Sequence, residues 1–216
     1  MFKTIKNAWG IPDLRKKILF TLLIIIVFRC GAVIPVPFLD ASALQSIMSS
    51  VSNGTSGTAL GYIDLLSGGS FSRATLFALS ITPYINASII MQLLTVAIPA
   101  LERMVKDGGE EGRKKMAAIT RYVAVLLGLA TGLAYYFYLR NSTVNGSSVV
   151  KFTSGGSGIF AAFVIVLTFT AGTALMMWMG EQINQKGIGN GISILLFAGI
   201  VSRMPSLIGH LAEYIQ

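Results

Sequence analysis

The stretch LLSGGSF at residues 65–71 opens the part of the chain, 65–99, that decides the fold. An apolar pair runs into a glycine break, and a long apolar run that carries Pro83, Asn86 and Gln92 follows it. Irregular backbone at membrane depth is tolerated only where protein buries it or where it lines a water-filled cavity. We therefore expect residues 65–99 to line a cavity inside a membrane protein.

The rest of the chain is similarly apolar. Of the 216 residues, 53% are hydrophobic and 12% are charged, whereas soluble domains carry about 25% charged residues. Five apolar tracts result, each near the roughly 20 residues that cross a bilayer as a helix. The tracts are residues 18–36, 71–99, 117–139, 158–180 and 192–211. This pattern predicts an all-α membrane protein, a five-transmembrane-helix bundle.

Lysine and arginine residues indicate which connecting segments face the cytoplasm. They gather in segments 1–17 and 100–116, and Lys186 lies in segment 181–191. The positive-inside rule therefore predicts a cytoplasmic N-terminus. The external segments are then 37–70, 140–157 and the end of the chain, 212–216. Because the net charge of +8 follows from this distribution, we expect no direct specific binding of nucleic acid.

The sequence lacks the residue patterns of an enzyme or a metal protein. It has one cysteine and one histidine, Cys30 and His210, and its nine acidic residues lie in loops or at tract ends. Nucleophilic catalysis needs an activated nucleophile, and a zinc site needs several ligands. We expect no catalytic residue, no metal and no cofactor, and the chain reads as a passive conduit or a scaffold.

Residues one helical turn apart mark two candidate faces. Ile81 and Ile85 share one face, and Ile192 and Leu196 share another. Pro83 removes a backbone donor and is expected to kink its helix. From this pattern alone the isoleucines fit lipid or core contacts as well as a pore.

Two glycine-rich segments read as turns. Residues 107–112 are expected to prevent a regular helix across the loop that contains them. Residues 180–191 have four glycines and are expected to form a tight turn that opens a helix. Gly128 and Gly132, four residues apart, allow two helices to approach closely.

Several short motifs resemble the SecY family, the channel subunits of the bacterial Sec protein translocase. They are VFR (27–29) with IPVP (34–37), SGG (67–69), SRA (72–74), PYI (83–85), ASIIMQLLT (87–95), GEQI (180–183) and GIGNGIS (187–193). The resemblance implies the N-terminal half of a ten-helix inverted-repeat channel. Such a channel passes unfolded preproteins across the bacterial plasma (inner) membrane and releases transmembrane segments laterally into lipid.

The resemblance also implies roles for individual residues. The pore ring would comprise Ile81, Ile85, Ile192 and Leu196. The plug would comprise Ile63, Asp64, Leu65, Leu66, Ser67, Gly68, Gly69, Ser70 and Phe71. The gate helix would carry Pro83, Ser88, Ile89 and Gln92. The implied partners are SecE, SecG, the SecA motor, the ribosome, signal peptides, nascent polypeptides, membrane lipid and the missing C-terminal half.

Two other functions fit part of the sequence. A half of a secondary transporter would also combine a broken helix with inverted repeats, although its usual intramembrane ionisable groups are missing. The second alternative is a fragment that acts as a scaffold or as an inserting substrate. The chain ends at Gln216 after five of the ten spans, so we expect it to need the other half.

Overall fold

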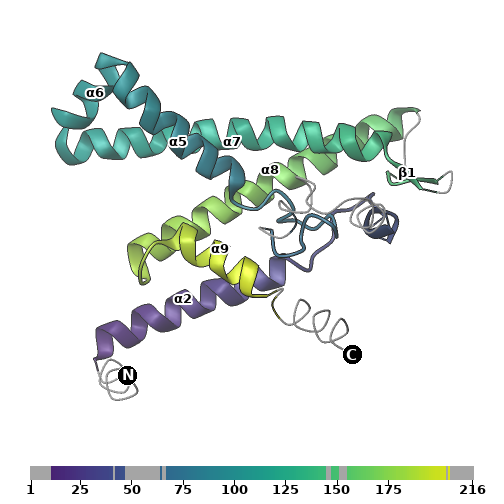
Figure 1. Ribbon diagram of the computed structural model, residues 1–216, viewed down its shortest axis with the longest axis horizontal. Coiled ribbons are helices and arrows are strands. Elements are labelled where there is room, and N and C mark those ends of the chain that lie inside the picture. The colour runs from purple at the N-terminus through teal and green to yellow at the C-terminus, as the bar shows by residue number, and fades with distance from the viewer. Residues whose placement is uncertain are drawn as a thin grey trace, which may run out of the picture.

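The computed structural model describes residues 11–40, 42–46, 64, 67–144, 147–150, 155–202 and 204. Its described part is mostly helical (Figure 1). The helices are α2 (Pro12–Gly31), α5 (Thr82–Ala97), α6 (Pro99–Lys106), α7 (Gly109–Asn141), α8 (Gly155–Lys186) and α9 (Gly191–Val201). Two short antiparallel strands, β1 (Thr143–Val144) and β2 (Ser147–Ser148), form a hairpin between α7 and α8.

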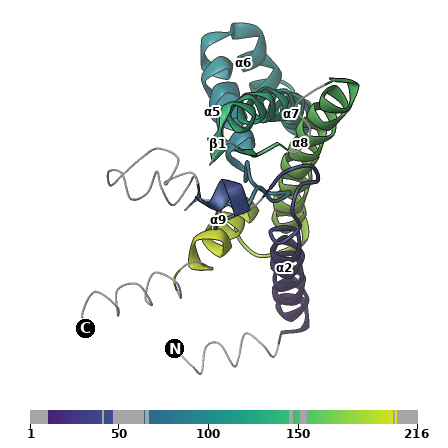
Figure 2. The ribbon, with the colours of Figure 1, turned by 90° about the vertical axis from the view of Figure 1, so that its right-hand side faces the viewer.

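Helices α7 and α8 form the frame of the molecule. They approach each other where Gly128 faces Thr173 and Gly132 faces Phe169, and they diverge toward the start of α7 and the end of α8 (Figure 1). Helix α5 packs on α7, whereas α2 and α9 pack on α8 (Figures 1 and 2). Each of the five predicted apolar tracts overlaps one of the helices α2, α5, α7, α8 and α9.

Length and composition identify the helices of this part of the chain that can cross a membrane. Helices α7 and α8 each meet that requirement. Helices α5 and α6 meet it together, with a bend of 100° between them, and count as a third span if the bent pair is one span. Helix α9 is apolar but has 11 described residues.

The predicted second span, 71–99, is not one helix, because residues 71–80 form turns and α5 begins at Thr82. Ala74 and Ser80 have positive φ angles, which a helix does not allow. The amide of Leu76 donates to the carbonyl of Ile34, and the amide of Val36 donates to the carbonyl of Ala74. These two bonds tie the segment to the chain that follows α2, and other backbone bonds, such as the one from the amide of Ala78 to the carbonyl of Thr75, close tight turns within it.

The expected kink at Pro83 is also wrong. Pro83 lies in the first turn of α5, where its missing N–H would have no helical partner in any case. The bend comes instead between Ala97 and Pro99.

The predicted loop 100–116 is largely helical. Helix α6 covers its first part, and α7 already begins at Gly109, so the chain breaks only at Asp107 and Gly108. A Cβ atom on Gly112 would lie 1.9 Å from the carbonyl oxygen of Met104. This glycine therefore lets α6 and α7 touch, and it does not interrupt the helix.

Helix bounds differ from the predicted tract bounds elsewhere too. Helix α2 starts at Pro12, before the tract 18–36, and α8 runs on to Lys186, beyond the tract 158–180. The turn expected over residues 180–191 is therefore confined to residues 187–190, and it does open a helix, α9.

Candidate functional site where helices α5 and α9 begin

An apolar cluster lies at the starts of α5 and α9, and we call it the central cluster. Its buried members are Ile24, Phe28, Ala32, Phe77, Ile81, Met176, Met179, Ile183 and Leu195. Of the four predicted ring residues, Ile81 is fully buried in this cluster, and Ile85, Ile192 and Leu196 are partly buried against it. The structure therefore brings all four together, although they come from two helices about 110 residues apart in sequence.

Gly180 is the point on α8 where the two helix starts meet. A methyl group on Gly180 would lie 3.5 Å from Cδ1 of Ile81 and 3.7 Å from Cγ1 of Ile192. The contact extends to the backbone, since a Cβ atom on Gly191 would lie 2.0 Å from the carbonyl oxygen of Gly180. Two glycines thus set how closely Ile81 and Ile192 approach each other.

Polar side chains hold the turn that precedes Ile192. Asn184 accepts a hydrogen bond from the amide of Gly191 at 2.7 Å, and Asn190 caps α9 by accepting from the amide of Ile192 at 3.1 Å. Thr21 of α2 accepts from the amide of Ile188 at 3.2 Å. The motif over residues 187–193 therefore fixes where α9 starts, with one contact from α2.

Asp64 and residues 67–71 are the described part of the predicted plug, and Ile63, Leu65 and Leu66 lie outside the described residues. The carbonyl and carboxylate oxygens of Asp64 accept from the amides of Gly69 at 2.9 Å and Ser72 at 2.8 Å, respectively. The hydroxyl of Ser67 accepts from the amide of Phe71 at 3.1 Å. These bonds fold the segment into a compact, largely buried turn.

Two neighbours hold this turn. A Cβ atom on Gly68 would lie 2.8 Å from the carbonyl oxygen of Gly199, so the segment rests on the backbone of α9. The hydroxyl of Tyr135 on α7 donates to the carbonyl of Phe71 at 2.9 Å, and the two rings are 4.5 Å apart. Ser70 is 1% exposed, and its hydroxyl has no hydrogen-bond partner among the described residues.

Arg29 is a cation within the first apolar tract, and the structure gives it a partner. Its guanidinium donates to the carbonyl of Ala198 on α9 and lies 5.3 Å from the centre of the Phe28 ring. A backbone carbonyl and an aromatic face both favour a cation. Arg29 therefore links α2 to α9 beside the central cluster.

The predicted gate residues lie on two sides of α5. Gln92 donates to the hydroxyl of Ser88 at 3.2 Å, so these two share a polar face one turn apart. Ile89 is 51% exposed, whereas Pro83 is buried. Helix α5 therefore presents Ile89 to its surroundings while its first turn stays in the core.

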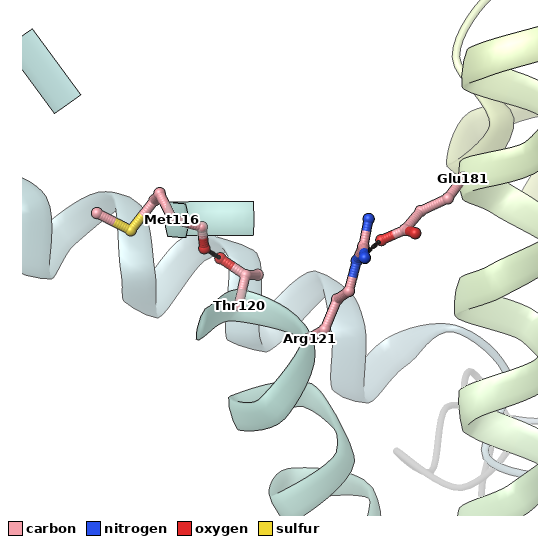
Figure 3. Close-up of polar contacts among 4 residues, drawn as sticks. All are labelled: Met116, Thr120, Arg121 and Glu181. Carbon is pink, nitrogen blue, oxygen red and sulfur yellow. Dashed lines mark hydrogen bonds and ion pairs between the residues drawn. The ribbon is translucent and has the colours of Figure 1, made fainter. Parts of the chain in front are cut away.

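The prediction from sequence missed an ion pair between α7 and α8. Nε of Arg121 donates to Oε1 of Glu181 at 2.6 Å (Figure 3). The side chain of Glu181 is 17% exposed and that of Arg121 is 46% exposed. Opposite charges at corresponding depths of two neighbouring apolar tracts were the signal that could have revealed the pair.

Acidic and other ligand-type side chains do not gather further in the described part of the chain. No three His, Cys, Asp or Glu residues there lie close enough to hold a metal ion.

The arrangement of helices defines the class of this protein. It matches the solved structures titled "The structure of a protein conducting channel" and "Sec61 in the Canine ribosome-channel complex from the endoplasmic reticulum". Each match has a TM-score of 0.58 at 16% identity and covers 92% of this chain and 41% of the other. The chain thus has the fold found in these channel structures, and the predicted all-α membrane fold is confirmed.

Sequence relatives narrow the class to a family. The SecY family model matches residues 75–216. The protein translocase subunit SecY of Bacillus subtilis is 46% identical over 219 residues, which cover 99% of this chain and 46% of that protein. The SecY subunit of Thermotoga maritima is 44% identical over 96% of this chain and 47% of its own length. The chain belongs to the SecY family, and it spans about half the length of the curated relatives it matches.

Proposed function

We propose that the chain supplies the N-terminal half of the central subunit of a protein-conducting channel. In this role it passes unfolded preproteins across the membrane and releases transmembrane segments sideways into lipid. The observation that carries the proposal is that Ile81 and Ile192 both lie against Gly180, beside a buried turn that rests on α9. An aliphatic constriction and a movable obstruction are the two parts that such a channel needs.

The ring residues supply the constriction. Ile81, Ile85, Ile192 and Leu196 present only aliphatic groups, and a narrow aliphatic passage excludes water and ions. These side chains can change rotamer when a polypeptide passes between them. In the complete channel the other half contributes the remaining members of the ring.

The segment 63–71 supplies the obstruction. Gly68 and Gly69 have positive φ angles of 66° and 84°, which glycine adopts at low cost. The buried hydroxyl of Ser70, for which the described residues supply no hydrogen-bond partner, lowers the stability of the closed arrangement. A segment that is folded locally but has an unsatisfied polar group is suited to leave its site when a polypeptide enters.

Helices α5 and α7 form one side of the lateral exit. Helix α5 exposes Ile89, Leu93 and Val96 along one side. An apolar segment that moves from water to lipid gains roughly 25 cal/mol for each Å² of apolar surface. This gain drives the sideways release, with Pro83, Ser88, Ile89 and Gln92 on the helix that the segment passes.

The site of action is the bacterial plasma membrane, with a cytoplasmic N-terminus. The basic residues near the starts of α2 and α7 favour this orientation. The partners are the other half of the channel, SecE, SecG, the SecA motor, the ribosome, signal peptides and nascent polypeptides. Support comes from the family, whose members are translocase subunits, and from a structural relative titled as part of a ribosome-channel complex.

The test measures ion conductance and preprotein export by a complete channel that contains this half. Ile85→Ser and Leu196→Ser are the main variants because both side chains are only partly buried. We expect each to raise the resting ion leak and to relax signal-sequence selectivity. Leu175→Ser, at an exposed position of α8, is the matched control. Unchanged leak and unchanged selectivity in both variants would remove the ring assignment.

A further inference from the structure

A groove between α7 and α8 lies apart from the central cluster. It encloses about 660 Å³. Its α7 wall includes Leu133 and Phe137, and its α8 wall includes Phe163 and Leu167. These four side chains are between 40% and 66% exposed in this chain. An open apolar groove on the outside of two membrane helices requires an apolar occupant.

One end of the groove is cationic. Of the described residues that line it, Arg140 alone carries a charge. Arg140 lies in the last turn of α7, and its guanidinium has no ion pair or hydrogen bond with the described residues. Gly158 lines the groove near the start of α8, where the helix dipole also favours negative charge. The occupant should therefore be apolar over most of its length and anionic at this end.

At the other end the two helices close the groove, and the polar side chain there has a hydrogen-bond partner. A Cβ atom on Gly132 would lie 3.7 Å from Cβ of Phe169, so the two helices nearly touch there. Thr170 donates its hydroxyl proton to the carbonyl of Val166 at 2.8 Å. No free polar group remains at this described end to attract a charged occupant.

The length of the groove matches one leaflet of a bilayer. From Leu129 to Arg140, both of which line it, α7 advances about 16 Å at 1.5 Å per residue. Half of the roughly 30 Å hydrocarbon thickness is about 15 Å. Arg140 and the aromatic residues Tyr136 and Phe137 then stand at the depth of the lipid headgroups, where aromatic belts occur.

We propose that this groove binds a phospholipid of that leaflet. One acyl chain lies between α7 and α8, and the phosphate accepts hydrogen bonds from the guanidinium of Arg140, which suits phosphate geometry. The proposal goes beyond channel function, since it requires only that the two helices stand in a membrane.

Photolabelling of the reconstituted full channel tests the proposal. The probe is phosphatidylglycerol with a diazirine in one acyl chain, diluted into phosphatidylcholine vesicles. We expect labelling to concentrate on peptides that contain residues 129–140 and 158–170. Arg140→Gln should lower it about fivefold, the effect of one cation near an anionic lipid surface. Arg113→Gln, an exposed arginine at the other end of α7, should leave it unchanged.

Ala162→Trp supplies a second variant, because its larger side chain fills the groove between the two helices. It should lower groove labelling without changing labelling elsewhere on α8. Excess inorganic phosphate should not compete. Labelling that is even over all exposed faces, that survives Arg140→Gln, or that inorganic phosphate abolishes would overturn the proposal. Since the readout is lipid contact, a failure here leaves the channel assignment standing.

Discussion

Arg121 and Glu181 are two charged residues that lie where apolar helices meet. The ion pair between their side chains offsets the cost of removing both charges from water. Glu181 follows Gly180 directly, so the pair stands one residue from the contact between α5, α8 and α9. The bond at 2.6 Å joins α7 to α8. Because Glu181 is mostly buried, removing its partner leaves a charge with few other contacts.

We expect a double-mutant cycle with Arg121→Gln and Glu181→Gln to give a coupling energy near 1 kcal/mol, the upper end for partly exposed pairs. Thermal unfolding of the four proteins in detergent measures it. The matched control is Lys115 with Glu111, an i,i+4 pair whose side chains are 63% and 79% exposed. Equal coupling for both pairs would show that burial of Glu181 does not strengthen its bond.

The same substitution is expected to have opposite effects at two glycines, Gly191 on α9 and Gly132 on α7. At Gly191 an added Cβ would lie 2.0 Å from the carbonyl oxygen of Gly180, whereas at Gly132 its nearest neighbour would lie 3.7 Å away. Gly191→Ala should destabilise the protein by more than about 2 kcal/mol or displace α9. Gly132→Ala should be neutral or stabilising by up to about 1 kcal/mol, because alanine favours the helix. Thermal unfolding separates the two, and a neutral Gly191→Ala would contradict the observed packing.

The elements show where local preference yields to tertiary contacts. Residues 71–80 contain good helix formers such as leucine and alanine, yet they form tight turns, and two backbone bonds tie these turns to Ile34 and Val36. The reverse holds for α6 and α7, where glycines that suggested a loop serve close packing on Met104. Helix α5 therefore starts at Thr82, and this start places Ile81 in the central cluster.

The hydrogen bond of Tyr135 is expected to help attach the turn that ends at Phe71 to α7. The hydroxyl of Tyr135 donates to the buried carbonyl of Phe71 at 2.9 Å. Tyr135→Phe keeps the ring contact and leaves that carbonyl without this donor, so it should cost about 1 kcal/mol. Tyr122→Phe, on the same helix and 78% exposed, is the control in thermal unfolding. A cost no greater than that of the control would show that the bond does not hold the segment.

The distribution of basic residues over the whole molecule predicts which end faces the cytoplasm. The start of α7, which contains Lys114, and the β1–β2 hairpin, which contains Ser148, lie at opposite ends of α7 (Figure 1). In a Cys30→Ser background, a cysteine at 114 should react with a membrane-impermeant maleimide only from the cytoplasmic side. A cysteine at 148 should react only from the outside. Reaction of both from one side would contradict the orientation that the basic residues indicate.

The sequence by itself determined the class of this protein. Long apolar tracts and sparse charge indicate a helical membrane protein. The bilayer core offers the backbone no hydrogen-bond partner, and a helix pairs its own backbone groups. Motifs such as that over residues 187–193 indicate the SecY family, and the similarity to SecY proteins confirms this assignment. The shared faces of Ile81 with Ile85 and of Ile192 with Leu196 also follow from helical period alone.

Only the tertiary structure decided how these faces meet. Ile81 and Ile192 both lie against Gly180, Arg121 bonds to Glu181, and the turn from 67 to 80 bonds to the chain after α2, so each arrangement joins residues far apart in sequence. Local pattern reports which groups one helix presents, but not which neighbour satisfies them. The described stretch from 67 to 97 is therefore a packed turn followed by a helix, because backbone groups such as the amide of Leu76 bond to other segments.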